Sequence, residues 1–452
     1  MGKMQLPPDH TPDGIDLSGL AGLMAEAGVF RLYAKVLSEN DNSKNQVYLG
    51  MGFEAINIIP NGGVYSDPGS KNQILKSDIS FSWINLRGQL HPAPNAQLIL
   101  YPQYPEIRMS GFLKGCREAP SDIMRVREQG RALFIGIKND GAVIGYAAAA
   151  GSPLANELVT RTDLAELGVF REIPLSTSGA VGNNREMLLA GLGRIHRLGW
   201  VTSKRLRPDG SPGPCSSSNC GGYTLEAELG VTPNGYSEPD FLGWEVKQHN
   251  SPDLNQPELS TSPITLMTPE PTGGFYRDAG VEAFVRRFGY PDTKGRPDRL
   301  NFGGIFRNGS RAGRTGLTLA LDGFDATAGK IENLSGGITL FTDSGEAAAV
   351  WGYAALIGHW TRKHAMAVYV PSQFRKDPAR QYRFGHLVRL GEKTDFLFFL
   401  KAMARGSVYY DPGIKIEGES TSRPVIKRRS QFRIKSEFIF ELYKTMTTEA
   451  VT

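Results

Sequence analysis

Cysteine is scarce in this chain, with three residues among 452. Three thiols cannot build the disulfide framework of a small secreted protein, and Cys215 and Cys220 have no neighbouring histidine or cysteine to complete a zinc site. We therefore expect reduced, structural thiols. The sequence also lacks an apolar run of about 18 residues, which a membrane helix needs, and the apolar core of a signal peptide near its start. These absences predict a cytoplasmic protein.

Several enzyme motifs and any large excess of charge are missing as well. The glycine-rich run GGIFRNGSRAG lacks the lysine of a nucleotide-binding P-loop, and no glycine motif of a methyltransferase occurs. The net charge is only +5, from 51 basic and 46 acidic residues, which permits nucleic-acid binding without requiring it. The function must therefore be sought in local motifs rather than in composition.

The length of 452 residues exceeds one ordinary core and predicts two or three domains. We interpret residues 1–27, which include a short amphipathic helix from Leu17 to Ala27, as a tether. Residues 28–160 carry short β-type runs such as QVYLG and AQLILYP between Asn, Gly and Pro clusters, which predicts a small β-barrel. Residues 161–183, ending in STSGAVGNN, are the predicted linker to a second domain over residues 184–452.

The second domain mixes helical and β-type patterns. Apolar residues recur at helical spacing over about 184–198 and around Val281 to Phe288, whereas GLTLALDGF and GGITLFTD indicate strands. We expect the apolar run from Ala347 to Arg362 to be one core helix, followed by a buried strand, HAMAVYVPSQ. This alternation predicts an α/β domain.

The most informative stretch, GGYTLEAELGVTPNGYSEPDFLGWEVKQ, collects several residues with catalytic potential. Glu226 lies in TLEAELG, which we predict to be helical up to Gly230. A loop containing Pro, Asn and Gly leads to Asp240, and FLGWEVK follows. One acid on a helix and one in a loop therefore precede an apolar strand.

The strand itself has two different faces. If Trp244 to Gln248 is extended, side chains alternate, so that Glu245 and Lys247 share one face while Trp244 and Val246 share the other. The first face carries the chemistry and the second faces a core.

A bend is needed to bring Asp240 to the same place. Asp240 lies five positions before Glu245, and this odd separation would send the two carboxylates to opposite faces of a straight strand. Gly243 permits a bulge or a hairpin turn. Two converging carboxylates would hold Mg²⁺, and Lys247 could orient an attacking water beside a phosphate. The alternative is an ordinary hairpin with exposed charges, because a D/E-x-K triplet alone is a weak signal.

The combination TLE-x2-LG, a loop and PD-x4-E-x-K resembles the active-site region of the MvaI/BcnI restriction endonucleases and, more loosely, that of MutH-type mismatch-repair nicking enzymes. The resemblance implies an α/β (α+β) PD-(D/E)xK nuclease fold. It also implies a catalytic quartet of Glu226, Asp240, Glu245 and Lys247.

The same resemblance implies Mg²⁺ as the cofactor. Asp240, Glu245 and the carbonyl of Val246 would bind the metal, and Glu226 would bind a second metal through water or position one. Glu228 and Glu238 have no counterpart in the family pattern, so we expect them to be solvated.

Two polar loops of the first domain, SENDNSKNQ and YPQYPEIRMSGFLKG, resemble the arms of the DNA-binding pseudobarrel that forms the EcoRII-type effector domain. The resemblance implies an N-terminal β-rich DNA-binding domain whose arms grip a groove. Composition alone leaves solvated loops as the alternative. The implied contact residues are Lys44, Asn45, Gln46, Arg108 and Lys114.

Two further segments of the second domain are candidates for DNA contacts. The loop WVTSKRLRPDGSPG enters the catalytic helix, where a substrate phosphate would lie close. RPVIKRRSQFRIK resembles the C-terminal recognition segment of the MvaI/BcnI enzymes, and arginine forks can pair with guanine O6 and N7. A solvated basic surface is the alternative for both. The candidates are Lys204, Arg205, Arg428, Arg429, Gln431 and Arg433.

The two resemblances together imply a type II restriction endonuclease, of subtype IIE, that cleaves double-stranded DNA. Family members that resemble both halves recognise CCWGG, which is the implied target, and CCSGG, which the BcnI branch recognises, is the alternative. One active site per chain predicts a monomer that cuts the two strands in succession, with a second site copy on the N-terminal domain as an activator. A cognate DNA methyltransferase is the implied partner in a restriction-modification system. The alternatives are a MutH-like strand-nicking repair endonuclease and a catalytically inactive DNA-binding regulator.

Overall fold

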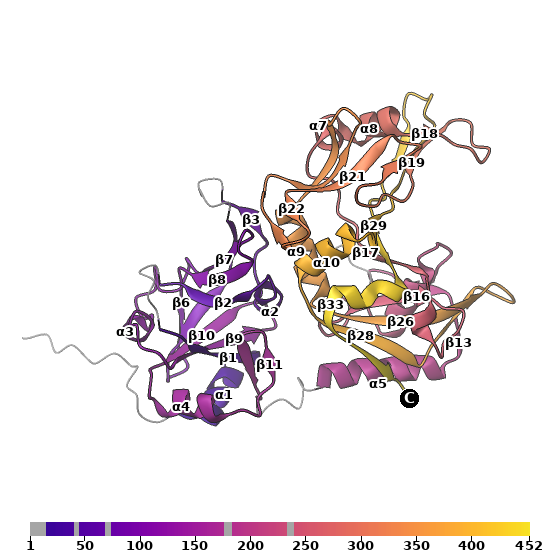
Figure 1. Ribbon diagram of the computed structural model, residues 1–452. Coiled ribbons are helices and arrows are strands. Elements are labelled where there is room, and N and C mark those ends of the chain that lie inside the picture. Colours follow the sequence, from indigo (N-terminus) through magenta and orange to yellow (C-terminus); the bar gives the residue numbers. More distant parts are fainter. Residues whose placement is uncertain (1–14, 40–44, 68–73, 176–182, 233–238) are drawn as a thin grey trace, which may run out of the picture. The chain divides into compact units, whose positions relative to one another are not determined.

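The computed structural model describes residues 15–39, 45–67, 74–175, 183–232 and 239–452 (Figure 1). Lys44 and Glu238, both named above, lie outside these residues. The chain divides into two compact units, Met1–Arg185 and Glu186–Thr452, here termed the N-terminal and C-terminal units. Both mix helices with sheets. Within the described residues, no helix has the length and apolar character that crossing a membrane would require.

The N-terminal unit is built on two sheets. The seven-stranded sheet has the order β11 (Glu166–Leu167), β12 (Phe170–Ile173), β1 (Val29–Leu37), β9 (Arg131–Lys138), β10 (Val143–Ala148), β5 (Phe81–Ile84), β6 (Leu90–Pro92). The five-stranded sheet has the order β2 (Val47–Met51), β8 (Glu106–Ser110), β7 (Gln97–Tyr101), β4 (Leu75–Asp78), β3 (Tyr65–Ser66). The helices are α1 (Leu17–Glu26), α2 (Ala55–Ile58), α3 (Ser121–Met124) and α4 (Pro153–Thr160).

The first helix differs from the predicted tether. The Asp16 side chain caps α1 by accepting a hydrogen bond from the Gly19 amide at 2.7 Å. The buried face of α1 packs into the core of the unit together with α4 (Figure 1). The predicted linker differs too, because β12 pairs with β1 over Leu32 to Ala34. Amphipathic spacing identified α1, but only packing shows that its apolar face has a partner.

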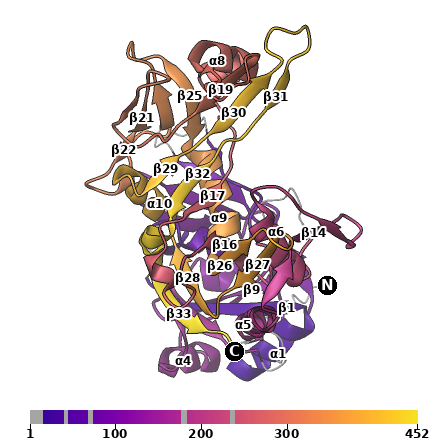
Figure 2. The ribbon, with the colours of Figure 1, turned by 90° about the vertical axis from the view of Figure 1, so that its right-hand side faces the viewer.

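The C-terminal unit is centred on a six-stranded sheet. Its order is β13 (Trp200–Thr202), β27 (Gln381–Phe384), β26 (Met366–Arg375), β28 (Leu387–Thr394), β33 (Tyr443–Ala450), and β16 (Glu245–Asn250) pairs in parallel with β26. Figure 2 shows β16, β26 and β28 in this unit. One face of the sheet packs on α5 (Asn183–Arg197) and α6 (Cys220–Glu228) through an apolar cluster that includes Trp244 and Val246. The predicted strand and its core face are confirmed.

Smaller sheets complete the C-terminal unit. They comprise β14 (Lys204–Leu206) with β15 (Pro212–Pro214); β17 (Pro263–Met267), β32 (Phe432–Lys435) and β29 (Val408–Tyr410); β18 (Tyr290–Pro291), β19 (Arg299–Gly303), β30 (Gly413–Glu417) and β31 (Val425–Lys427); β20 (Arg311–Ala312), β21 (Leu317–Asp322), β24 (Gly337–Phe341) and β25 (Ala347–Gly352); and β22 (Phe324–Asp325) with β23 (Lys330–Ile331). The remaining helical elements are α7 (Phe275–Asp278), α8 (Gly280–Phe288), α9 (Tyr353–His364), α10 (Phe396–Ala404), η1 (Pro257–Leu259) and η2 (Ser436–Leu442).

The apolar run predicted as a single helix is in fact two elements. Ala347–Gly352 forms β25, which pairs with β24, and the helix α9 begins only at Tyr353. Trp351 is buried in the strand, where its ring nitrogen donates to the Pro269 carbonyl at 3.0 Å. The prediction was wrong because a continuous apolar run fits a buried strand and a buried helix equally well.

Candidate active site

The helix α6 is fixed to the chain that precedes it. The buried Thr224 hydroxyl donates to the Cys220 carbonyl at 2.6 Å and accepts from the Lys204 amide at 3.1 Å. The next residue, Leu225, packs in the core of the unit. Glu226 follows in the last turn, and Gly230 adopts a positive φ of 78° beyond the helix end. The predicted helix is therefore confirmed, with Glu226 on a firmly held turn.

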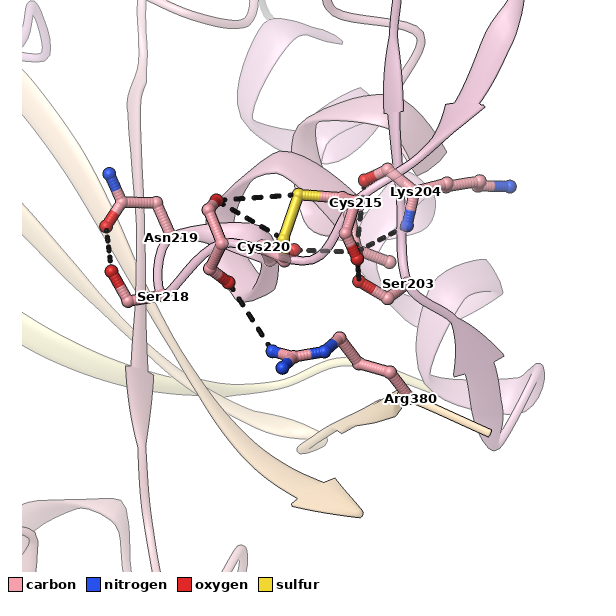
Figure 3. Close-up of a disulfide and its surroundings, with 9 residues drawn as sticks. Ser203, Lys204, Cys215, Ser218, Asn219, Cys220 and Arg380 are labelled. Carbon is pink, nitrogen blue, oxygen red and sulfur yellow. Dashed lines mark hydrogen bonds between the residues drawn. A yellow bond between two sulfur atoms is a disulfide. The ribbon is translucent and has the colours of Figure 1, made fainter. Parts of the chain in front are cut away.

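A disulfide joins Cys215 to Cys220, the first residue of α6 (Figure 3). The prediction of reduced thiols is wrong for this pair. The intervening loop folds back, so that the two Cα atoms lie 5.7 Å apart, within bridging distance. Arg380 holds the same loop by donating to the Ser217 carbonyl at 3.4 Å. Cys116 is a free cysteine.

The bend predicted at Gly243 is present as a tight hairpin turn. Leu242 and Gly243 both have positive φ values, 49° and 85°, and Phe241 and Trp244 exchange backbone hydrogen bonds of 3.0 and 2.8 Å across them. The turn folds Asp240 back onto the strand that follows. Its Oδ2 accepts a hydrogen bond from the Val246 amide at 2.9 Å. The odd spacing of the two carboxylates is therefore accommodated by the turn.

Glu245 is the centre of the cluster, with a side chain only 1% exposed. Its Oε1 accepts a hydrogen bond from the Lys247 ammonium, whose side chain is 18% exposed. The ammonium of Lys363 lies 3.4 Å from the same oxygen. Glu245 Oε2 is buried without a hydrogen-bond partner. Sequence reasoning missed Lys363, which lies on α9, 118 positions after Glu245, and no local motif connects the two.

The acids of the quartet influence one another electrostatically. Burial, reinforced by the charge of Asp240, raises the pKa of Glu226 to about 7. Burial and the charge of Glu245 likewise raise the pKa of Asp240. Burial pushes the pKa of Glu245 upward, but the charges of Lys247 and Lys363 outweigh it and lower this pKa overall. The structure thus brings all four predicted catalytic residues into one charged cluster.

The donor set fits a hard cation. In the part of the chain that the structure describes, no three His, Cys, Asp or Glu side chains are already arranged to hold a metal. Instead, the ammonium groups of Lys247 and Lys363 both contact one carboxylate oxygen of Glu245. The other oxygen is buried and unpartnered, which is costly unless a donor or a cation meets it. Carboxylate oxygens are the ligands that Mg²⁺ prefers.

The predicted DNA-contact residues that precede α6 have different surroundings. Lys204 forms an ion pair with Glu228 at 2.5 Å, while Arg205 is exposed. Glu228 is only 10% exposed and also lies 3.9 Å from Arg194. The expectation that Glu228 is solvated is therefore wrong, because two cations from neighbouring elements cover it.

The C-terminal candidates lie on or before β32, outside the quartet. Arg428 and Arg429 are exposed, whereas Gln431 is buried and its Oε1 has no hydrogen-bond partner. Arg433 is held at its guanidinium by Asp411 at 2.6 Å and by Thr265 at 3.3 Å. The segment therefore contains two exposed cations and one guanidinium fixed in orientation.

In the N-terminal unit, Asn45, Gln46 and Arg108 line one cavity of about 270 Å³. Arg108 donates to Gln46 at 3.3 Å and forms an ion pair with Glu106 at 2.8 Å. Lys114 does not line this cavity. Its side chain is exposed, and its carbonyl accepts a hydrogen bond from Asn95. The structure thus brings three of the predicted residues together and leaves Lys114 apart.

The chain is similar to a known protein family and to two solved structures. Residues 189–443, more than half of the chain, match the model of the MvaI/BcnI restriction endonuclease family. Restriction endonuclease MvaI in complex with cognate DNA is 16% identical, with 58% of this chain and 97% of that chain covered and a TM-score of 0.43. MvaI without DNA is 14% identical, with 60% and 98% covered and a TM-score of 0.31. None of the curated proteins matches the chain. The family match shows that the chain belongs to the MvaI/BcnI restriction endonuclease family and is a site-specific deoxyribonuclease.

Proposed function

We propose that this restriction endonuclease hydrolyses double-stranded DNA with Mg²⁺ at the quartet of Glu226, Asp240, Glu245 and Lys247, on a PD-(D/E)xK fold. One observation supports the proposal above all. Glu245 presents a buried oxygen without a partner, while its other oxygen accepts from Lys247. Such an oxygen is suited to a metal ion, and such an ammonium is suited to the water or phosphate beside it.

Each residue has a distinct role in the proposed reaction. Asp240 and Glu245 would hold the metal together with the carbonyl of Val246, and the Val246 amide donates a hydrogen bond to Asp240. Glu226 would bind a second metal through water or position one. Lys247 orients the attacking water in line with the scissile bond. Bound Mg²⁺ would supply Lewis-acid polarisation of the phosphodiester. The products are 5′-phosphate and 3′-hydroxyl ends.

Digestion of a plasmid followed by sequencing of its ends tests this function. We expect discrete double-strand cuts at CCWGG with Mg²⁺ and none with a chelator. A product that is only nicked would favour a MutH-like repair nickase. DNA binding without any cleavage would instead identify a regulator with an inactive nuclease fold. A different cut sequence would correct the target and leave the chemistry intact.

For the N-terminal unit we propose the role of an effector domain that binds a second copy of the site, as in subtype IIE enzymes. The support is the cavity where Asn45, Gln46 and Arg108 meet, since amides and guanidinium groups suit base edges. We propose that Lys44 and Lys114 flank this contact. In the C-terminal unit, Lys204 and Arg205 would meet phosphates, and Arg428, Arg429, Gln431 and Arg433 would face bases.

With one quartet per chain, we propose a monomer that cuts the two strands one after the other. It would act in the cytoplasm, beside a methyltransferase that protects the same sequence in host DNA.

Deleting residues 1–180 tests the effector role. The deletion ends before α5, so the C-terminal unit keeps all of its own elements. We expect the truncated enzyme to cleave DNA but to lose the acceleration that an added cognate duplex gives the full chain. Cleavage of a one-site plasmid, with and without added duplex, measures this. A truncated protein that is folded yet inert would show that the N-terminal unit is integral to catalysis.

A further inference from the structure

The end of helix α9 is fixed next to the catalytic strand. β26 follows α9 almost at once and pairs in parallel with β16, where Ala367 lies opposite Glu245. His364 is fully buried, donates from its ring Nε2–H to the Leu266 carbonyl at 2.9 Å, and stacks on Trp360 with ring centroids 4.2 Å apart. The backbone at Lys363 is therefore held at the same end of the sheet as Glu245.

The Lys363 side chain extends from this fixed point into the acidic cluster. Its ammonium lies 3.4 Å from Glu245 Oε1, and 25% of the side chain remains exposed. Burial and neighbouring carboxylates raise the pKa values of Glu226 and Asp240, and the positive charge of Lys363 partly opposes this rise, so Lys363 lies within electrostatic reach of every acid of the quartet. Lys363 is thus a partly accessible cation in a site that is otherwise largely buried.

Two ammonium groups share one carboxylate oxygen of Glu245, but they are not equivalent. Lys247 lies on β16 itself and donates directly to Oε1, whereas Lys363 makes the longer contact and is the more exposed of the two. At a pH above 7, where all three carboxylates are ionised, they and the two lysines carry a formal charge of −1. A divalent cation on the carboxylates would bring this formal charge to +1. The electrostatic attraction between Glu245 and Lys363 would then be weaker.

A DNA phosphate carries the single negative charge that would restore the balance. Lysine is a flexible point charge with three donors, and it binds phosphate oxygens without strict geometry. On the basis of the proposed function, we propose that Lys363 is a second catalytic lysine. Its ammonium separates from Glu245 and donates a hydrogen bond to a non-bridging oxygen of the DNA phosphate at the cleavage site. Lys247 remains with the attacking water.

A purely structural role is the competing explanation. A lysine in the last turn of a helix can stabilise it through the helix dipole, and its loss would then lower stability without touching DNA. The two roles differ in the salt dependence of DNA binding, because each lost phosphate contact reduces the slope of log affinity against log salt by about 0.9.

The test compares Lys363→Met and Lys363→Arg with Lys330→Met as a matched control. Lys330 is similarly exposed, at 34%, and forms a similar ion pair, at 3.3 Å from Glu332. Duplex affinity is measured in Ca²⁺ over a series of salt concentrations, and single-turnover cleavage in Mg²⁺. For Lys363→Met we expect cleavage about 100-fold slower, as for loss of one transition-state donor, and a slope reduced by about 0.9.

Lys363→Arg should keep the slope and recover part of the rate, and Lys330→Met should match the wild type in both. The proposal would be overturned if Lys363→Met cleaved DNA at the wild-type rate and had the wild-type slope of log affinity against log salt, while Lys247→Ala was inactive in the same assay. An unchanged slope with a lowered melting temperature and no rescue by arginine would also overturn it. If the wild-type enzyme itself neither bound nor cut DNA, the proposed function would fail first.

Discussion

Asp240→Ala and Lys247→Ala are each expected to abolish Mg²⁺-dependent cleavage, by a factor on the order of 10⁴, while specific duplex binding in Ca²⁺ persists. Asp240 supports the site twice, because its Oδ2 accepts from the Val246 amide and its charge acts on Glu226 and Lys247. Removing Lys247 leaves the buried Glu245 without its shortest ion pair. Single-turnover cleavage and a gel-shift measurement in Ca²⁺ separate chemistry from binding.

Matched controls for this experiment come from the hairpin of β22 and β23. Asp325 also accepts hydrogen bonds from backbone amides, at 2.8 Å from Thr327, and Lys330 is also paired with a glutamate. Asp325→Ala and Lys330→Ala should cleave at wild-type rates. Full Mg²⁺-dependent activity in either Asp240→Ala or Lys247→Ala would remove the assignment of this site.

Glu226→Gln should abolish cleavage and, at the same time, stabilise the metal-free enzyme at alkaline pH. Burial and the charge of Asp240 raise the pKa of Glu226 from 4.5 to about 7 in the folded state. The folded state therefore binds the proton more tightly than the unfolded chain. The free energy of unfolding therefore falls as the pH rises from 4.5 to 7, and this loss of stability is complete above pH 7.

One pKa unit corresponds to about 1.4 kcal/mol, so after allowance for partial exposure we expect Glu226→Gln to gain about 2 kcal/mol at pH 8. At pH 4 both side chains are neutral, and the gain should vanish. Urea unfolding without divalent ions at the two pH values measures this. Asp253→Asn, at an exposed acid, serves as the control and should show no such difference. If Glu226→Gln and the wild type were equally stable at pH 8, this would contradict the placement of the Glu226 carboxylate in a buried position next to Asp240.

The sequence was sufficient to predict the parts of the site that neighbouring residues determine. The alternation around Val246 places Glu245 and Lys247 on one face, and the odd spacing from Asp240 demands the turn that Gly243 then makes. Both follow from the two-residue repeat of a strand and from the freedom of glycine at positive φ.

Contacts between distant segments could not be predicted in this way. Lys363 reaches Glu245 only because β26 pairs with β16, and Glu228 is covered only because β14 and α5 bring Lys204 and Arg194 to it. Each of these contacts depends on which strands and helices are neighbours, and one sequence carries no local signal for that choice. The same limit explains why the sequence predicts a tether where α1 packs into the core.

The bond between Cys215 and Cys220 has a practical consequence for the laboratory. Protein kept with a thiol reductant would have this disulfide reduced, and protein kept without it would have the disulfide intact. The two forms differ in mass by two hydrogens. The entropic gain from closing so short a loop is about 2 kcal/mol. Because the bond anchors the segment that leads to Glu226, this difference would appear as batch-to-batch variation in heat tolerance and specific activity.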